Sequence, residues 1–363
     1  MASPTSSLSS SHLAAVLHED FKDGHSSSIT VRTERVETRV PGPGEAIVRL
    51  SYAALNHRDL WMRKGAYGRM TGLPCTLGSD GYGVVEVVGS EADKHWVGRG
   101  ALLYPGLDWG TSDEAPGPAW RILGVPDAGT WAEAITVPVA QLYEAPEHLT
   151  PAEAAALPLA GVTAHRALFY RGGLSEKDAR GKRVLITGIG GGVAQFALQF
   201  ALATGAEVWV TSGSEAKLRA AVAVGAHGGA LYTTENWGAA LNTQLARPAG
   251  APDSGKFDLC IDSASGPGWV DICEALRPGG KLVYFGATRG AGAIPMRKAF
   301  FKQLDILGTA LGSPNDFRDM LKFVEEKKIR PAIDSEFALA DAEQALAHME
   351  SGEQTGKIVL KIS

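Results

Sequence analysis

The stretch VLITGIGGGVAQFALQFALATGAEVWVTSGS, residues 184–214, begins as an apolar, β-branched run, breaks at a cluster of glycines and continues with the spacing of an amphipathic helix. A second apolar run then ends in small hydroxyl side chains. A glycine string alone is equally typical of a flexible turn, but a strand before it and a helix after it favour a dinucleotide-binding loop. In such a loop the glycines permit a tight turn and bring backbone N–H groups at the helix start close to a pyrophosphate. The stretch therefore predicts a cofactor-binding domain of alternating strands and helices.

The alternation of strands and helices continues around this stretch. Strand-like runs occur at KRVLITG, AEVWVTS, GGALYTT, FDLCIDSA and GKLVYFGAT, and helical runs such as EAKLRAAVAVG and PGWVDICEALRPG lie between them. This order predicts an α/β fold in which a doubly wound parallel sheet occupies residues 159–310.

Residues 30–140 have a different pattern, in which short alternating runs are cut by glycine and proline. This pattern is typical of an antiparallel, barrel-like β domain, predicted to span residues 1–158 and 311–363. Residues 337–363 read as an amphipathic helix followed by the strand KIVLKI, which we expect to pair with this domain. Residues 104–129 form a long insertion rich in Pro, Gly and Asp, which indicates a mobile loop or a functional lid.

The composition excludes several classes of protein. With 363 residues, 45% of them hydrophobic and 21% charged, and a formal net charge of -5, the chain lacks the basic excess needed to bind a nucleic-acid backbone. The three cysteines are far apart and show no CxxC spacing, so neither a disulfide framework nor a cysteine-rich zinc site is expected. No run approaches the ~20 apolar residues that cross a membrane. The Ser-rich residues 1–16 are interpreted as a disordered leader, and a cytoplasmic location is expected.

The glycine loop and the end of the next strand supply the first cofactor-binding candidates. Four of them lie in the loop and at the helix start: Gly188, Gly191, Gly192 and Val193. An NAD site usually ends the second strand with a carboxylate that accepts from the ribose 2′-hydroxyl, whereas residues 211–214 are Thr, Ser, Gly and Ser. The hydroxyls of Ser212 and Ser214, together with Lys217, could bind a 2′-phosphate instead. NADP(H) is therefore the predicted cofactor, and Glu215 is interpreted as the first residue of a helix.

Together these motifs resemble the medium-chain dehydrogenase/reductase superfamily, and within it the zinc-independent quinone oxidoreductase branch, which includes zinc-type alcohol dehydrogenase-like members. The resemblance runs from about residue 31 to the C-terminus and depends on the segments GEAIVRLSYAALNHRDLWMRKGAYG, LPCTLGSDGYGVVEVVG, AAALPLAGVTAHRAL, TGIGGGVA and ALAHMESGEQTGKIVLKI. It implies a GroES-like β-barrel catalytic domain and a Rossmann NADPH-binding domain. It also implies a homodimer in which the strand around LDILGTAL extends the Rossmann sheet into that of the partner.

The resemblance also indicates that this branch has lost the catalytic metal. Zinc-dependent members hold zinc with Cys, His and a further Cys, at positions similar to Asn56, Ser79 and Leu159 here. None of these residues supplies a thiolate, an imidazole or a carboxylate. His57 and Asp80 lie beside two of the positions, but they would leave a zinc ion without a third protein ligand. The four-cysteine lobe that holds a structural zinc is also missing, and no metal is expected.

Without a Lewis acid, hydride addition to an isolated carbonyl is difficult, whereas an alkene or quinone conjugated to a carbonyl spreads the developing charge onto an oxygen. The expected substrate is therefore a small α,β-unsaturated carbonyl (an enone) or a quinone. The segment NHRDLWMRKGAY is similar to the family pattern N-x-x-D-x-x-x-R-x-G-x-Y, which implies the catalytic candidates Asn56, Asp59 and Tyr67. Asn56 could donate an N–H to the substrate carbonyl, and Tyr67 could donate its O–H, stack on a flat ring or only line the pocket. Asp59 could shape the loop or form a structural ion pair with Arg63.

The resemblance implies six further cofactor contacts, at Thr163, Tyr232, Gly286, Ala287, Leu311 and Gly312. Thr163 matches a threonine that lies against the nicotinamide, and Tyr232 matches a tyrosine that flanks the adenosine 2′-phosphate. The alternatives are a helix-interior threonine that bonds to its own backbone and a tyrosine of the core. The small residues follow strands of the parallel sheet, where such folds bind ligands.

Other residues with chemical potential have simpler interpretations. His57 and His165 have no partner that the sequence reveals, and a hydrogen-bonded structural histidine is the interpretation we adopt for both. Three tryptophans lie in or beside the 104–129 insertion, where they could form a small core of its own or extend the pocket towards a larger substrate: Trp109, Trp120 and Trp131.

The sequence thus predicts an NADPH-dependent, metal-independent reductase of enones or quinones, with no nucleic-acid or membrane partner. One alternative is a biosynthetic tailoring enoyl reductase, specific for one secondary-metabolite intermediate that the Trp-rich insertion selects. A second alternative is a non-enzymatic NADPH-binding protein that acts as a sensor or structural component. Broad turnover of simple quinones would count against the first, and binding of NADPH without turnover would favour the second.

Overall fold

The computed structural model describes residues 9–22, 26–68, 70–245 and 256–363. The chain forms two compact units, one of residues 1–159 and 333–363 and the other of residues 160–332. The first boundary between the units, 159/160, lies one residue from the predicted 158/159. The second boundary lies at 332/333 and not at the predicted 310/311. Residues 311–332 cluster with the second unit because the helix α9 (Pro314–Lys327) is tied to it by a buried ion pair between Arg166 and Asp316. The ring of Phe323 on α9 also packs against Phe169 and Phe200.

The second unit contains a six-stranded sheet in which every pairing is parallel. Across the sheet the strands follow the order β13 (Gly228–Leu231), β12 (Glu207–Ser212), β11 (Arg183–Ile186), β14 (Phe257–Asp262), β15 (Leu276–Tyr284) and β16 (Asp305–Gly308). The order reverses between β11 and β14, which is the switch point where doubly wound sheets bind ligands. The predicted doubly wound sheet is confirmed.

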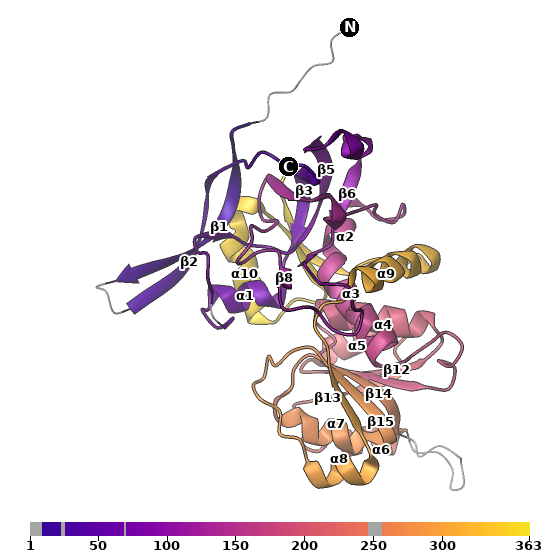
Figure 1. The fold of residues 1–363 in the computed structure, drawn as a ribbon. Coiled ribbons are helices and arrows are strands. Elements are labelled where there is room, and N and C mark those ends of the chain that lie inside the picture. The colour runs from indigo at the N-terminus through magenta and orange to yellow at the C-terminus, as the bar shows by residue number, and fades with distance from the viewer. Residues whose placement is uncertain (1–8, 23–25, 69, 246–255) are drawn as a thin grey trace. The chain divides into compact units, whose positions relative to one another are not determined.

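Helices cover both faces of this sheet. They are α3 (Pro158–His165), which continues as a π-helical segment Arg166–Arg171, α4 (Gly192–Ala203), α5 (Glu215–Ala223), α6 (Trp237–Gln244), α7 (Trp269–Ala275), α8 (Met296–Lys302) and α9. The helix α4 lies on one face, and α6, α7 and α8 lie on the other (Figure 1). Strand β11 is buried along its whole length because both of its faces are covered.

The first unit is built mainly from antiparallel strands. Its largest sheet has the order β10 (Leu142–Tyr143), β6 (Gly100–Leu103), β5 (Asp80–Val88), β3 (Glu45–Ala54), β18 (Lys357–Lys361) and β17 (Ile333–Ala338), and β9 (Ala134–Pro138) also pairs with β3. A second sheet has the order β2 (Ser26–Glu37), β1 (Ser11–Lys22) and β4 (Cys75–Thr76), and β7 (Gly106–Leu107) pairs with β8 (Arg121–Ile122). The helices are α1 (His57–Arg63), α2 (Pro151–Ala156) and α10 (Ala342–Ser351). Short 3₁₀ turns occur at Glu91–Trp96, Val139–Gln141 and Leu339–Asp341, with a further one at Gly266–Gly268 in the other unit.

The last strand joins the centre of the first unit. Val359 and Leu360 of β18 lie opposite Ala54 and Ala53 of β3 in an antiparallel pair. The predicted pairing of the C-terminal strand with the first domain is therefore confirmed. This pairing brings Lys357, at the start of β18, close to the loop that follows β3.

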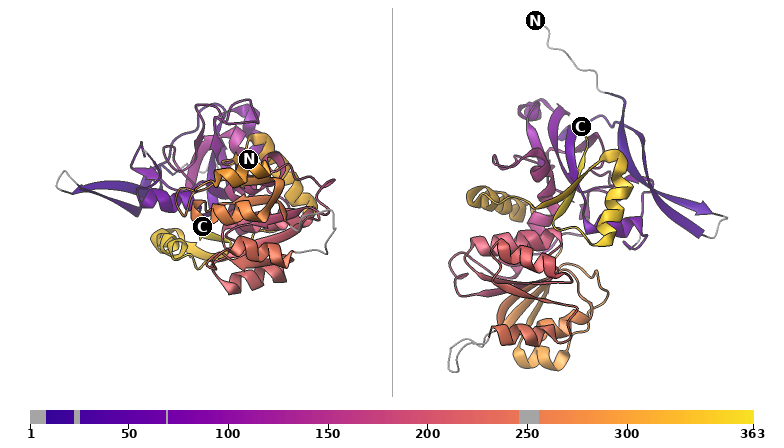
Figure 2. Two further views of the ribbon diagram at one scale, coloured as in Figure 1. Left: turned by 90° about the horizontal axis from the view of Figure 1, so that it is seen from below. Right: turned by 180° about the vertical axis from the view of Figure 1, so that it is seen from behind.

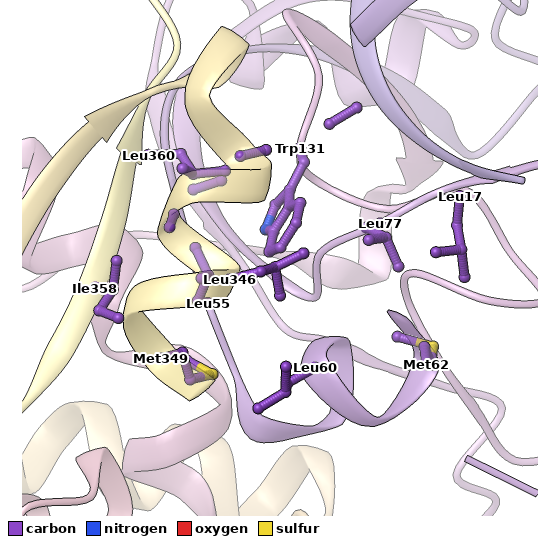
Figure 3. Close-up of a cluster of buried hydrophobic side chains, with 14 of the residues drawn as sticks. Leu17, Leu55, Leu60, Met62, Leu77, Trp131, Leu346, Met349, Ile358 and Leu360 are labelled. Atoms are coloured by element: carbon purple, nitrogen blue, oxygen red, sulfur yellow. The ribbon is translucent and has the colours of Figure 1, made fainter. Parts of the chain in front are cut away.

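The main core of the first unit surrounds a tryptophan. Trp131 is fully buried among leucines and methionines of α1, α10 and β18 (Figure 3). Gly78 lies against this ring with a φ of +95°, and a Cβ at that position would be 2.2 Å from Trp131 Cδ1. Only glycine meets both conditions, since other residues rarely adopt this backbone conformation. Trp131 is therefore a core residue and does not extend a pocket.

The N-terminal expectation is wrong in part. Residues 1–8 lie outside the described residues, but β1 begins at Ser11, within the stretch interpreted as a leader. Residues 14–17 are buried, and β1 pairs with both β2 and β4. Its apolar residues 13–17 form one continuous run after the serines and do not alternate with polar residues, so the strand pattern is weak. With β2 it forms a hairpin that extends from the rest of its unit (Figure 2).

The 104–129 insertion has a small core of its own, as one of the two interpretations of its tryptophans predicts. The Trp109 side chain is buried, and its ring meets that of Trp120 edge-on with the centroids 5.6 Å apart. Arg121 forms ion pairs with Asp108 at 2.9 Å and with Asp127 at 2.6 Å. These contacts give the insertion a defined structure, and its tryptophans do not specifically favour a pocket for a large substrate.

Two further expectations concern the helices. No helix in the described part of the chain is long and apolar enough to cross a membrane. His165, at the end of α3, is buried, and its ring packs against Phe169, Phe200 and Phe323 as a structural histidine would. Its buried Nδ1, however, has no hydrogen-bond partner among the described residues. Burial lowers the pKa of His165 to about 4.

This depressed pKa predicts an acid-dependent loss of stability. Below about pH 6.5 the unfolded chain binds a proton at His165 that the folded chain excludes, so the free energy of unfolding falls as the pH drops towards 4. Replacing the residue in His165→Phe keeps a ring in the aromatic cluster and removes this cost, about 3 kcal/mol at pH 4. Urea unfolding followed by circular dichroism, near neutral pH and near pH 4, measures the difference. The exposed-site control His95→Phe should keep the wild-type pH dependence; the same dependence in His165→Phe would contradict the assignment.

Candidate functional site

The glycine loop after β11 has the geometry of an anion-binding turn. Gly188 has a φ of +63°, which favours glycine, and its N–H lies 3.3 Å from Thr211 Oγ1 at the end of β12. Gly191 precedes α4 as its N-cap and offers no side chain to cap the helix. The N–H groups of the first helical turn, which includes Gly192 and Val193, have no acceptor within the helix. A Cβ on Gly191 would approach only the Gly188 carbonyl oxygen, at 3.5 Å. The space beside this glycine is therefore open to a bound pyrophosphate.

A buried carboxylate holds this loop in place from below. Thr187 Oγ1 donates to Asp262 Oδ1, at the end of β14. Asp262 Oδ2 accepts from Ser265 N at 2.8 Å and from Trp269 Nε1 at 3.0 Å. Asp262 is 1% exposed, and these bonds compensate for the burial of its charge. The residues of the loop thus fit a bound dinucleotide, and the switch-point strands β11 and β14 are joined directly beneath it.

The end of β12 carries hydroxyls and no carboxylate. Ser212 Oγ accepts from the Ser214 N–H at 3.1 Å, and Ser214 is the N-cap of α5 without using its own side chain as a cap. Lys217 lies in the first turns of α5. Glu215 is the first residue of α5, as predicted, and its carboxylate binds Arg219 at 3.3 Å on the exposed side of the helix. The structure therefore brings Ser212, Ser214 and Lys217 to one end of the sheet.

Tyr232 lies beside these hydroxyls. Its N–H donates to Ser212 O at 3.0 Å, and its ring stands against Gly213, where a Cβ would be 2.7 Å from the tyrosine hydroxyl. The side chain is half-buried and packs in part against the core of the second unit. Both interpretations made from the sequence, a wall for the adenosine phosphate and a core aromatic, are compatible with this placement.

The other predicted cofactor contacts fall into two groups. Thr163 is buried on α3 directly after Val162, and a Cβ on Gly312 would be 2.6 Å from Val162 Cγ2. Leu311 precedes that glycine with a φ of +53°. Gly286 follows β15 and lies close to the backbone of β14, because a Cβ there would be 2.5 Å from Ser263 O. Ala287 is exposed next to it. The roles of these residues towards the cofactor stay predictions.

In the first unit, the Asn56 side chain lies in a buried polar network. Asn56 Nδ2 donates to Asp80 Oδ2 at 2.9 Å, and Lys357 Nζ donates to Asn56 Oδ1 at 2.8 Å. Lys357 Nζ also donates to Asp80 Oδ2 at 3.0 Å and to Leu55 O at 2.6 Å. All three ammonium protons are used. These bonds determine which way the Asn56 amide faces and leave one of its two N–H hydrogens outside the network.

Asp59 shapes the start of α1 and does not face solvent. The side chain is fully buried, and its Oδ2 accepts from the Asn56 N–H at 2.7 Å. Burial raises the pKa of Asp59 to about 6. Asp59 does not pair with Arg63, which binds Glu343 of α10 at 2.7 Å instead. The ion-pair alternative is therefore wrong, and the role of Asp59 towards a substrate stays a prediction.

Arg58 connects Tyr67, Ser79 and the insertion. Arg58 Nη1 donates to Ser79 Oγ at 2.7 Å and to Leu123 O at 2.6 Å. Its guanidinium also lies 5.1 Å from the centroid of the Tyr67 ring, which is 39% exposed. His57, in contrast, is exposed. Its ring meets that of Trp61 edge-on, with the two centroids 6.0 Å apart. The structural interpretation of His57 is thus not supported by burial.

The residues at the zinc-ligand positions do not fit a zinc ion. The Asn56 amide is bound to Asp80 and Lys357, and the Ser79 hydroxyl accepts from Arg58 and donates to Leu123 O at 2.7 Å. Leu159 contributes only its backbone N–H, which donates to Asp80 Oδ1 at 2.8 Å. Zinc requires thiolate, imidazole or carboxylate ligands, and the Lys357 ammonium already neutralises the carboxylate present. In residues 9–22, 26–68, 70–245 and 256–363, no group of three or more His, Cys, Asp or Glu side chains could hold a metal ion.

Sequence reasoning missed two members of this site. Lys357 stands in the apolar run KIVLKI, where β18 is buried from its first residue to Leu360. A lysine at a buried strand position is the signal that could have identified it. Arg58 lies within the NHRD segment itself, but only the fold shows that its side chain turns inwards.

Comparisons with known proteins agree with this architecture. Residues 42–147 match the family model described as "Alcohol dehydrogenase GroES-like domain", and residues 192–326 match the one described as "Zinc-binding dehydrogenase". A crystal structure of an NAD-dependent alcohol dehydrogenase superposes with a TM-score of 0.84 at 32% sequence identity, covering 97% of this chain and 100% of that chain. The predicted fold class, a GroES-like domain and a Rossmann-like parallel-sheet domain, is confirmed.

Whole-length relatives lead to the same family. The "Zinc-type alcohol dehydrogenase-like protein YogA" of Leptosphaeria maculans is 34% identical over 342 residues, which cover 90% of this chain and 93% of that protein. The quinone oxidoreductase of Mus musculus is 28% identical over 328 residues, covering 88% of this chain and 90% of that protein. With both family models matched in chain order and with relatives aligned along nearly its whole length, the chain belongs to the medium-chain dehydrogenase/reductase superfamily of oxidoreductases.

Proposed function

We propose that this protein is an NADPH-dependent, metal-independent reductase of small α,β-unsaturated carbonyls or quinones, acting by hydride transfer. The observation that carries the proposal is the buried network of Asn56, Asp80 and Lys357, which fixes an amide donor at a position where zinc-dependent relatives place a metal ligand. The similarity to a quinone oxidoreductase supports the same reaction class.

The second unit is proposed to hold the cofactor. The N–H groups at the start of α4 would bind the pyrophosphate, and the hydroxyls of Ser212 and Ser214 with Lys217 would bind the 2′-phosphate. The absence of a carboxylate at residues 211–214 is what favours NADPH over NADH. Bound NADPH supplies the hydride that adds to the electron-poor carbon of the conjugated substrate.

The first unit is proposed to stabilise the charge that develops on the substrate oxygen. Because Asp80 and Lys357 hold the Asn56 amide, its remaining N–H needs no reorientation to donate to that oxygen. Lys357 has no free proton to give, since all three of its hydrogens are bound to acceptors. Tyr67 is exposed enough to donate its O–H or to stack on a flat substrate.

Exposed features of the second unit and the state of the cysteines support a proposal for the assembly and location of the protein. We propose a homodimer through β16, which is the outer strand of its sheet and has an edge to offer a partner. Phe300 and Phe301 of the preceding helix are 59% and 72% exposed, which supports an apolar contact there. All three cysteines, Cys75, Cys260 and Cys273, are free and buried, which supports a cytoplasmic location.

The reaction class is tested by a matched pair of substrates. The protein should oxidise NADPH in the presence of cyclohexenone or benzoquinone but not of cyclohexanone, because only the first two accept hydride by conjugate addition. The measurement is the loss of NADPH absorbance, with NADH in parallel. Turnover of cyclohexanone would contradict the proposal. NADPH binding with no turnover of either conjugated compound would support the non-enzymatic alternative.

A substitution at Asn56 tests the proposed oxyanion donor. In Asn56→Leu, kcat for cyclohexenone should fall by about a hundredfold, as it does when one preorganised donor is removed. The Kd of NADPH, measured by fluorescence, should stay the same because the cofactor loop is in the other unit. The control is His57→Leu, at the neighbouring exposed position, which should keep the wild-type kcat. An Asn56→Leu protein with unchanged kcat and intact circular dichroism would rule out this role.

A further inference from the structure

One exposed arginine of the second unit, Arg289, lies outside the hydrogen-bond network of Asp262. The guanidinium of Arg289 lies over the ring of Tyr232, with its Cζ 5.0 Å from the ring centroid. Arg289 follows β15 by five residues, and Tyr232 directly follows β13, at the other side of the sheet order. The loop after β15 therefore crosses the carboxyl ends of the intervening strands to reach Tyr232.

The backbone of this loop is fixed where it crosses. Phe285 N donates to Asp262 O at 3.1 Å, and Arg289 N donates to Ala264 O at 2.9 Å. Gly266, with a φ of +70°, lies so close that a Cβ there would be 2.7 Å from Arg289 O. Gly290 N donates to Ala287 O at 3.0 Å and closes a turn. The position of Arg289 above β13 thus follows from contacts of the loop with β14 and the residues after it.

The platform beneath the guanidinium is also fixed. Tyr232 N donates to Ser212 O at 3.0 Å, and the ring stands against Gly213 with no space for a side chain between them. The ring of Tyr232 is therefore held beside the turn of residues 212–214. An arginine stacked on it is held by the attraction between the cation and the face of the ring.

Among the described residues, the guanidinium of Arg289 lies over the Tyr232 ring and has no carboxylate partner. Arginines elsewhere in this unit bind carboxylates, as Arg183 does with Glu207 at 3.1 Å and Arg277 with Asp258 at 2.7 Å. Arg289 is exposed and forms no ion pair with the residues that the structure describes. Its planar group offers five N–H donors, which suit a phosphate through two parallel hydrogen bonds.

We propose that Arg289, stacked on Tyr232, binds the 2′-phosphate of NADP(H) and is a specificity-determining residue for this cofactor. This inference rests on the proposed preference for NADPH and adds a residue from the far side of the sheet to Ser212, Ser214 and Lys217. A phosphate bound there meets hydroxyls from β12 and a cation from the loop after β15. The ribose hydroxyl of NAD lacks the charge that would engage that cation.

The test distinguishes a contact of Arg289 with the 2′-phosphate from a contact with the adenine. Affinities of 2′,5′-ADP and 5′-AMP are measured by isothermal titration calorimetry for the wild type, Arg289→Gln and Arg289→Lys. We expect Arg289→Gln to lower the affinity for 2′,5′-ADP by about tenfold and to leave the affinity for 5′-AMP unchanged, because a charge-assisted contact to the 2′-phosphate is lost. Arg289→Lys keeps the charge without the paired donors, so its affinity for 2′,5′-ADP should lie between those of the wild type and Arg289→Gln. The control Arg297→Gln removes an exposed arginine of α8 and should bind both ligands as the wild type does.

Each other outcome has a definite meaning. If Arg289→Gln weakens both ligands equally, the guanidinium contacts adenine and the inference is overturned. If it weakens neither while the wild type still prefers 2′,5′-ADP, the inference fails and the NADPH preference stands. If the wild type binds 2′,5′-ADP no better than 5′-AMP, both are overturned. Circular dichroism of the variants confirms that an exposed substitution has left the fold intact.

Discussion

The ion pair between Lys357 and Asp80 is the interaction on which the proposed chemistry depends. Both side chains are buried, 3% and 0% exposed respectively, and a buried pair is costly unless its remaining polar atoms are bonded. Here the three protons of Lys357 and both oxygens of Asp80 have partners. The pair therefore joins β18, β5 and the start of α1, and its net effect is to orient one amide, that of Asn56.

A second buried carboxylate has the corresponding place in the other unit. Asp262 binds the threonine before the glycine loop, the turn after β14 and the indole of Trp269. The glycine loop and the loop that carries Arg289 are both fixed to the end of β14, the latter through the backbone. In each unit, then, a fully bonded carboxylate positions groups that keep donors available: the Asn56 amide in one, and backbone amides with a guanidinium in the other. Donors that are already in place do not have to reorganise when charge arrives.

Much of the second unit could be predicted from the sequence because its signals are local. Glycines after a buried strand, a helix of the right length and a hydroxyl-rich strand end all lie within residues 184–214. The position of Gly312 against Val162 depends on packing between α3 and α9. The same packing explains why the second unit ends at residue 332 and not at the predicted residue 310. Local pattern does not contain such contacts.

The first unit was harder to predict because its site is assembled from distant segments. Asn56 was identified from its motif, but Lys357 lies some three hundred residues later and reaches it only because β18 pairs with β3. The partner of Arg63 was assigned wrongly for the same reason, since Glu343 belongs to a helix near the C-terminus. The strand β1 was missed because its apolar residues 13–17 form one run beside the serines and do not alternate with polar residues.

In the proposed reaction, an amide fixed by a buried ion pair takes the place of a catalytic metal. The most direct test is the zinc content of protein produced with added zinc, together with the rate of NADPH-dependent cyclohexenone reduction before and after treatment with a chelator. We expect far less than one zinc ion per chain and a rate that the chelator does not change. One zinc ion per chain, with the rate lost on chelation and restored by zinc, would contradict it.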